Sequence, residues 1–78
     1  MEITIRGKKH EIDNNKVMQA MKNTDPRRIV TYYIVIDGMK FPIKQIISKT
    51  LKISPMEFST MRAYQILQDL GFNIKEQN

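Results

Sequence analysis

Residues 32–42, with the sequence YYIVIDGMKFP, contain the strongest local structural signal in the chain. β-branched and aromatic residues are enriched in strands, and Asp37-Gly38 is a dipeptide that favours the two-residue turn of a β-hairpin. Residues 32–36 and 39–41 are therefore predicted to be two antiparallel strands. Pro42 ends the second strand and suits the first position of a helix, because it lacks only a donor that a helix start does not use.

An amphipathic helix is predicted directly after this hairpin. One apolar stripe of the helix consists of Ile43, Ile46, Ile47 and Leu51. Residues at this spacing lie on the same side of a helix and are typically buried. The opposite side carries Lys44, Gln45, Ser48, Lys49 and Lys52, so the outer face of the helix is basic.

A second amphipathic helix is predicted near the C-terminus. Ser54 and Glu57 have the spacing of a capping box, and Ser59 or Thr60 is a suitable N-cap for the helix that follows. Its buried side is expected to hold Ala63, Tyr64, Ile66, Leu67 and Leu70, and its outer side Met61, Arg62, Gln65, Gln68 and Asp69. Gly71 is placed as a helix terminator, and residues 72–74 alternate like a closing strand.

The first thirty residues predict a further hairpin and helix. Residues 3–5 and 10–12 alternate apolar and polar side chains around a turn at residues 7–9. Asp13 or Asn14 can cap a helix over residues 14–23, and Asp25-Pro26 favours one short helical turn over residues 27–30. The expected fold is thus a small α+β domain with two hairpins, about three helices and a closing strand.

Length and composition support one folded domain over residues 1–78. Hydrophobic residues make up 41% and charged residues 27% of the chain, which is too apolar for intrinsic disorder. The absence of cysteine excludes disulfides and fits a reducing compartment, so a cytoplasmic location is expected. No apolar run approaches the roughly 20 residues of a membrane span, and no signal peptide is visible, so no membrane association is expected.

Few residues suggest catalysis. His10 is the one histidine and has no cysteine or second histidine to complete a metal site. The carboxylates are scattered, and Asp13, Asp25 and Asp37 each occupy a cap or turn position. No nucleophile has a recognisable base, and three glycines form no phosphate-binding loop. We therefore expect no enzymatic activity, no metal and no cofactor.

The charge distribution favours a polyanionic partner. The chain has 13 Lys and Arg against 8 Asp and Glu, a formal charge of +5. No acidic residue occurs between Asp37 and Glu57, and Lys44, Lys49 and Lys52 lie there on the outer face of one predicted helix. Such a face can release counterions from a nucleic-acid backbone. A solvated lysine face without a ligand is the alternative interpretation.

The two C-terminal helices together resemble a helix-turn-helix, although residues 54–59 form a longer turn than the usual three or four residues. In that motif the early residues of the second helix contact base edges. With Ser59 as cap, the candidate base-reading residues are Thr60, Met61, Arg62 and Gln65, because Arg and Gln can bond bidentately to guanine and adenine. An ordinary exposed helix face is the alternative.

A family resemblance accompanies these patterns. Three segments of the chain resemble the small N-terminal head domain of McrA-like, modification-dependent HNH restriction endonucleases. They are residues 33–47, 57–59 and 66–72. The resemblance implies a DNA-associated module that stands alone, because 78 residues leave no room for the nuclease and its metal-binding histidines are absent. It also implies functional roles for Lys44 and the Phe58-Ser59 pair, and core positions for Phe41, Leu67, Leu70 and Phe72.

The function that these patterns favour is non-catalytic binding of nucleic acid, most simply duplex DNA, in regulation, defence or mobile elements. A protein-interaction adaptor is the alternative, with Met39, Met56 and Met61 as an adaptable docking surface. Single-stranded nucleic acid would require exposed aromatic side chains, for which Tyr32 is the candidate. One core is expected to contain Phe41, Ile43, Ile46, Ile47, Phe58, Leu67, Leu70 and Phe72.

Overall fold

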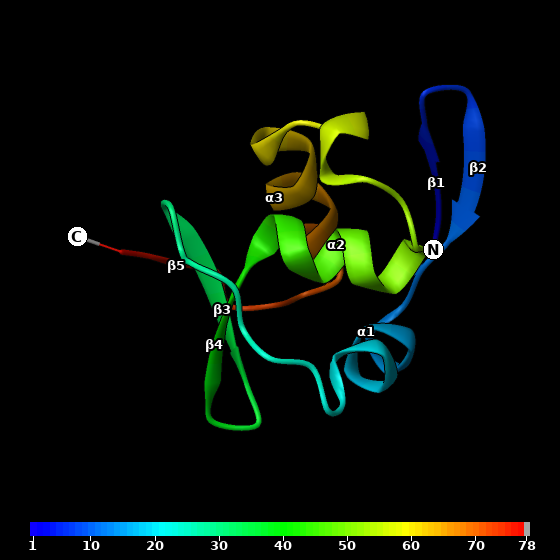
Figure 1. Ribbon diagram of the computed structural model, residues 1–78. Helices are drawn as coiled ribbons and strands as arrows, with labels where there is room; N and C mark the ends of the chain where they lie inside the picture. The colour runs from blue at the N-terminus through cyan, green and yellow to red at the C-terminus, as the bar shows by residue number, and fades with distance from the viewer. Residues whose placement is uncertain (78) are drawn as a thin grey trace.

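The computed structural model describes residues 1–77 and shows a small α+β fold with two antiparallel sheets and three α-helices (Figure 1). One sheet pairs β1 with β2, and the other has the strand order β4-β3-β5. The elements in chain order are β1 (Glu2–Ile5), β2 (Lys8–Glu11), α1 (Asn14–Met21), β3 (Tyr32–Ile36), β4 (Met39–Pro42), α2 (Ile43–Leu51), the 3₁₀ turn η1 (Pro55–Glu57), α3 (Thr60–Asp69) and β5 (Lys75–Glu76).

Both predicted hairpins are confirmed, and both close through two-residue turns. In the second hairpin Ile36 pairs with Met39, and Asp37 and Gly38 have φ angles of 51° and 79°. Positive φ at both central residues is the geometry of a type I′ turn, which matches the right-handed twist of the strands. The first hairpin has the same two-residue geometry at Arg6-Gly7, so the turn begins one residue earlier than the sequence suggested.

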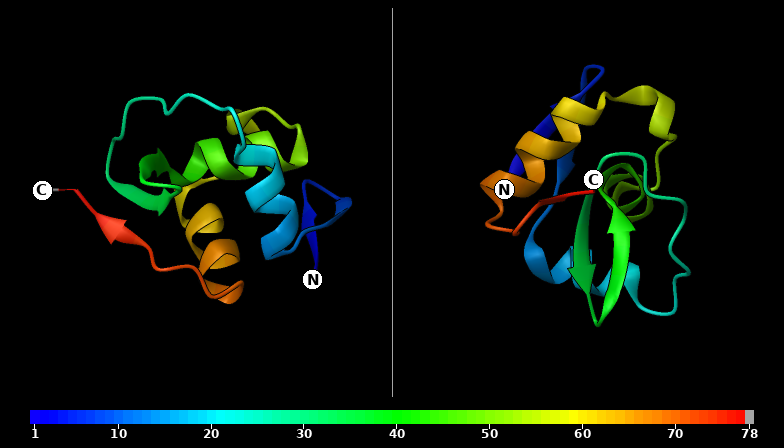
Figure 2. Two further views of the ribbon diagram at one scale, coloured as in Figure 1. Left: turned by 90° about the horizontal axis from the view of Figure 1, so that it is seen from below. Right: turned by 90° about the vertical axis from the view of Figure 1, so that its left-hand side faces the viewer.

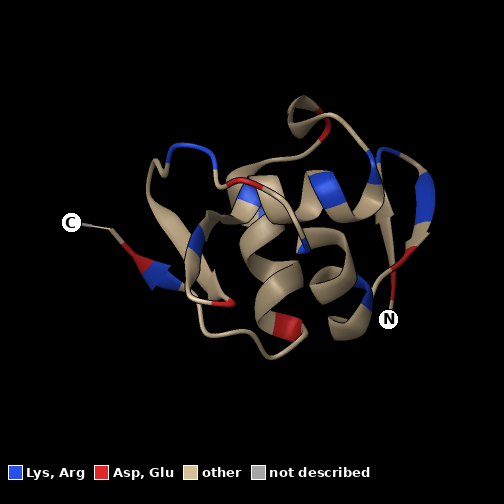
Figure 3. Cartoon of the chain, turned by 60° about the horizontal axis from the view of Figure 1, so that its bottom comes forward, with Lys and Arg blue, Asp and Glu red and all other residues tan. Residues whose placement is uncertain are grey.

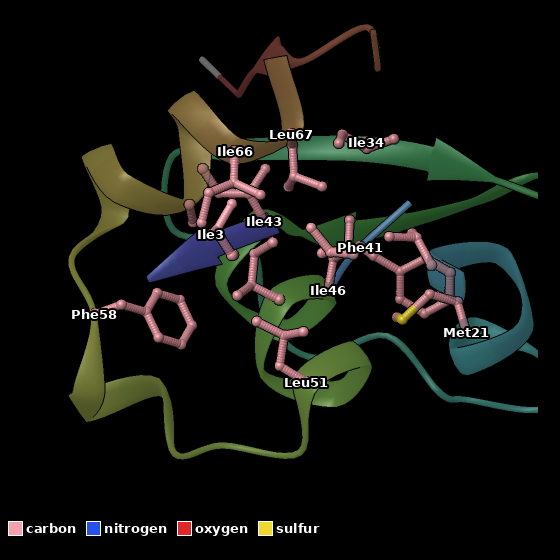
Figure 4. Close-up of a cluster of buried hydrophobic side chains, with 14 of the residues drawn as sticks. Ile3, Met21, Ile34, Phe41, Ile43, Ile46, Leu51, Phe58, Ile66 and Leu67 are labelled. Atoms are coloured by element: carbon pink, nitrogen blue, oxygen red, sulfur yellow. The ribbon is translucent and has the colours of Figure 1, made fainter. Parts of the chain in front are cut away.

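The core lies around α2, which α1 and α3 flank on two sides (Figures 1 and 2). The predicted apolar stripe of α2 is buried, and Phe41, Phe58 and Leu67 pack into the same cluster (Figure 4). Leu70 and Phe72 are half-buried and pack against the edge of that cluster. The predicted core is therefore confirmed, with these two residues at its periphery.

The helix starts follow the predicted capping residues closely. Asp13 caps α1 by accepting a bond from Lys16 N at 2.7 Å, and Ser59 caps α3 by accepting from Arg62 N at 3.1 Å. The capping box between Ser54 and Glu57 is also present and forms η1. Pro42 is the N-cap of α2 and the last residue of β4, so the predicted placement as first helical residue was wrong by one position.

The closing strand is displaced from its predicted position at residues 72–74. Gly71, with a φ of 91°, ends α3, and Phe72 N–H donates to the Leu67 carbonyl at 3.1 Å in a Schellman arrangement. This turn directs residues 72–74 onto the core, and the chain reaches the edge of β3 at Lys75, which pairs with Tyr33. The strand prediction was correct in kind and wrong in position.

The predicted helical turn at residues 27–30 is wrong. Residues 24–31, which we call the strap, contain no helix and run past the outer face of α2 (Figure 2). The Gln45 side chain takes the backbone groups that a helical turn would have used: its Nε2 donates to the Asp25 carbonyl, and its Oε1 accepts from Arg27 N, both at 2.9 Å. A contact from α2 therefore overrides the local helix-start signal.

The α2–α3 pair is looser than a helix-turn-helix. The two helices pack against each other, but residues 52–59 link them and include η1. A helix-turn-helix uses a link of about three or four residues. No helix within residues 1–77 has the length and apolar character needed to cross a membrane.

Candidate nucleic-acid interface

A groove of about 880 Å³ lies between the strap and the outer face of α2. The strap forms one wall, the exposed side of α2 forms the other, and η1 and the start of α3 close one end. Apolar residues contribute to its surface, including Pro42, Ile53 and Pro55. The groove therefore combines two segments separated in the sequence by the whole β3–β4 hairpin.

Five cations line this groove, which we call the basic groove. Arg27 and Arg28 belong to the strap, and Lys44, Lys49 and Lys52 belong to α2 and its C-cap. Basic segments of the strap and of α2 lie near each other in Figure 3. Asp25 is the one carboxylate among the described lining residues. The residues that line the groove therefore carry a net positive charge.

The groove cations have no carboxylate partners in the part of the chain that the structure describes. Within residues 1–77 the one salt bridge joins the Met1 amino group to Glu11 at 2.8 Å, away from the groove. Arg27, Arg28, Lys49 and Lys52 are exposed. Cations without internal partners can neutralise the phosphates of a polyanion and release its condensed counterions. The basic groove is therefore electrostatically available to an external anion.

Lys44 differs from the other two predicted lysines. Its side chain is half-buried, and its ammonium lies 5.3 Å from the ring centroid of Phe58, within the range of a cation–π contact. This contact holds the Lys44 side chain beside Phe58, the residue that directly follows η1. Of the three lysines predicted on the outer face of this helix, Lys49 and Lys52 are therefore exposed, whereas Lys44 is partly packed.

The predicted base-reading residues divide between two places. Thr60 is exposed and lines the basic groove together with the lysines. Ser59 uses its hydroxyl as the α3 cap, and Gln65 is exposed on α3 outside the groove lining. Arg62 is half-buried, and its Nη2 donates to the Thr4 carbonyl of β1 at 3.3 Å. The structure therefore brings Thr60 to the groove lysines and leaves Arg62 and Gln65 on a neighbouring surface.

Sequence reasoning missed Arg27 and Arg28. Their signal was visible as two adjacent arginines after Asp25-Pro26, but the capping pattern assigned them to a short helical turn. Their place opposite α2 depends on the bonds from Gln45, 18 and 20 residues away from its two partners. No local pattern could predict that contact.

The surfaces of the two alternative functions are also located. Met56 and Met61 are 88% and 57% exposed, whereas Met39 is 38% exposed and follows the turn of the β3–β4 hairpin. That turn and η1 lie on opposite sides of α2 in Figures 1 and 2. The three methionines therefore do not form one docking surface.

The prediction of Tyr32 as an exposed stacking residue is wrong. Tyr32 shares a strand face with the buried Ile34 and Ile36 and packs against the core. Its ring meets the Tyr64 ring edge-to-face with centroids 5.0 Å apart, and it also lines the basic groove. Tyr33, on the opposite strand face, is the residue whose ring Lys40 approaches, at 5.2 Å from the centroid.

Metal ligands are not assembled in the described part of the chain: residues 1–77 contain no group of three or more His, Cys, Asp or Glu side chains that could hold an ion.

Comparison with known proteins gives a family and no relative of known role. A family model described as SCO5918-like matches residues 1–78, so the chain belongs to the SCO5918-like family. No curated protein and no solved structure matches the chain. The description of the family states no ligand or activity, so the case for a function rests on the residues and geometry above.

Proposed function

We propose that this SCO5918-like protein binds duplex DNA without catalysis and holds a phosphate backbone in the basic groove. The observation that carries the proposal is the meeting of Arg27 and Arg28 on the strap with Lys44, Lys49 and Lys52 on α2. A phosphodiester strand places one negative charge at each nucleotide, so a groove lined by several cations fits a backbone better than a single small anion. The described groove offers one carboxylate, Asp25, against five cations.

Contacts in the groove would position the protein and would not distinguish sequences, because lysine and arginine contacts to phosphates carry no base information. Any base reading belongs to the exposed start of α3, beside the groove. Arg62 uses one of its five N–H groups on Thr4, which leaves others for a base edge, and Gln65 is fully available on the next turn. Asp69 lies one turn further along and would oppose a phosphate there, which limits this contact to the N-terminal half of α3.

The resemblance of residues 33–72 to the head domains of McrA-like restriction endonucleases supports DNA over RNA as the partner. It also supports a role in regulation, defence or mobile elements. In such a setting the domain would act as a DNA-associated module. The proposal accordingly assigns no reaction to the chain.

The decisive experiment measures the salt dependence of DNA binding by fluorescence anisotropy. An Arg27→Gln/Lys49→Gln variant removes one cation from each wall of the groove, and Lys40→Gln/Lys75→Gln removes the same charge from the three-stranded sheet. The slope of log K against log salt changes by about 0.9 for each phosphate that the protein no longer neutralises. We expect the groove variant to lower the slope by about two units and the sheet variant to leave it unchanged.

Equal slopes for the two variants would show that net charge, and not the groove, determines binding. Duplex RNA and single-stranded DNA serve as competing ligands in the same assay, and preference for either would overturn the assignment to duplex DNA. Binding of a protein partner through Met56 and Met61 would be comparatively indifferent to salt. A protein that binds no nucleic acid at low salt would contradict the proposal outright.

A further inference from the structure

The tip of the β1–β2 hairpin is a second concentration of positive charge, separate from the basic groove. Arg6, Lys8 and Lys9 are all exposed there. None of these cations has an ion pair within residues 1–77. The two acidic residues of the hairpin, Glu2 and Glu11, pair across its opposite end, where the Met1 amino group neutralises Glu11. The hairpin is therefore polarised, with cations at the tip and carboxylates at the base.

Turn chemistry does not account for Arg6 at this tip. Arg6 has a φ of 51° and Gly7 a φ of 80°, the arrangement of a type I′ turn. The first central residue of such a turn is most favourably Asn, Asp or Gly, because a positive φ crowds the Cβ of other residues. The β3–β4 hairpin uses the preferred Asp37-Gly38 pair in the same conformation. The first hairpin therefore has a locally unfavourable residue at its turn, and this residue carries a positive charge.

The β1 strand of the hairpin is anchored to the core. Ile3 and Ile5 of β1 are buried. Arg62 of α3 donates to the Thr4 carbonyl, and Ile12 N–H donates to the Met1 carbonyl at 2.9 Å. The backbone that carries the tip cations is therefore ordered before a ligand binds, unlike the backbone of a disordered tail.

The position of the hairpin suits a ligand that also occupies the groove. The hairpin stands beyond the C-terminal end of α2, and basic segments of the strap, α2 and the hairpin follow one another along the molecule in Figure 3. The longest dimension of the protein is 33 Å. One turn of duplex DNA is about 34 Å long, so the groove and the tip both fit within the length of one turn.

We infer that the Arg6–Lys9 tip is a second contact with the phosphate backbone of the duplex that occupies the basic groove. This inference rests on the proposed function and adds to it a two-part interface. The groove and the tip would each neutralise phosphates of the same duplex, about one helical turn apart at most.

The test compares Arg6→Asn with Lys75→Gln. Arg6→Asn installs the preferred Asn-Gly turn, so the variant should fold at least as well as the parent and any decrease in affinity reflects the missing charge. Lys75→Gln removes an equal charge from the far end of the molecule (Figure 1). Thermal unfolding confirms folding, and anisotropy with a 16-base-pair duplex measures affinity at 50 and 200 mM salt.

The expected result is specific to the tip. Raising the salt concentration from 50 to 200 mM should weaken DNA binding by the parent about 3.5-fold more than it weakens binding by Arg6→Asn. This difference corresponds to one neutralised phosphate. Lys9→Gln should behave like Arg6→Asn, and Lys75→Gln should match the parent. In an NMR titration the Gly7 amide should shift at the same DNA ratio as groove amides.

Two other outcomes separate this inference from the proposed function. If Arg27→Gln/Lys49→Gln lowers the salt slope while Arg6→Asn and Lys9→Gln do not, the groove binds DNA and the hairpin contact is refuted. If the parent protein binds no duplex at 50 mM salt, both the groove proposal and the hairpin inference are overturned.

Discussion

Replacing Gln45 with methionine should release the strap from α2. Methionine keeps the length of the side chain and its helix propensity but removes the two hydrogen bonds to the strap, at Asp25 O and Arg27 N. Each such bond contributes about 0.5–1.5 kcal/mol net, and both are near the surface, so the closed strap should be destabilised by about 1–2 kcal/mol. A change of this size multiplies the open population by roughly 5–30.

Amide hydrogen exchange at Arg27 measures the loss of this contact, because its N–H donates to Gln45 Oε1. Exchange should become roughly 5–30 times faster in Gln45→Met, while amides in β3 and α2 keep their rates. Gln68→Met makes the same chemical change at an exposed position of α3 and should alter neither. Gln45→Glu keeps an acceptor for Arg27 N–H but removes the donor to Asp25, so it should give an intermediate rate.

An Arg27 amide that exchanges at the same rate in Gln45→Met and Gln68→Met would refute the role of Gln45 as the residue that positions the strap. Under the proposed function, the open strap should also weaken DNA binding, because Arg27 and Arg28 no longer form a fixed wall opposite α2.

Three further substitutions test the packing and the charge placement. Leu67→Ala should lower the free energy of unfolding by about 2–5 kcal/mol in urea, since Leu67 is fully buried, and an unchanged midpoint would contradict its place in the core. Thr50→Val should raise the melting temperature, because the buried Thr50 Oγ1 has no hydrogen-bond partner among residues 1–77; destabilisation would show that the hydroxyl is satisfied. Lys52→Gly should stabilise the protein by about 0.5–1 kcal/mol, because Lys52 ends α2 at a positive φ of 58°, which glycine adopts more easily. The same substitution removes a groove cation and should lower the DNA salt slope by about one.

The elements that sequence patterns predicted correctly depend on neighbouring residues. Asp37-Gly38 determines a turn between strands that adjoin it, and Ser59 caps α3 through a residue three positions away. The apolar stripe of α2 has a period that follows from helix geometry alone. Such interactions span a few residues, so the order of types along the chain is enough to predict them.

Predictions failed where a distant contact changed the outcome. The β5 strand formed at Lys75 because the edge of β3 was available there, and residues 72–74 turned onto the core first. Tyr32 is half-buried because its strand face, shared with Ile34 and Ile36, packs on the core, where its ring meets Tyr64 of α3. Because successive side chains of a strand point to opposite faces of the sheet, a shift of one residue moves every side chain to the other face.

The sequence by itself determined the two hairpins, the three helices, the basic outer face of α2 and the excess of positive charge, because periodicity, turn chemistry and composition are local properties. Only the tertiary structure decided that Arg27 and Arg28 line one groove with Lys44, Lys49 and Lys52. That arrangement depends on the Gln45 side chain binding backbone groups of a segment 18 to 20 residues earlier in the chain, a contact that no local pattern encodes.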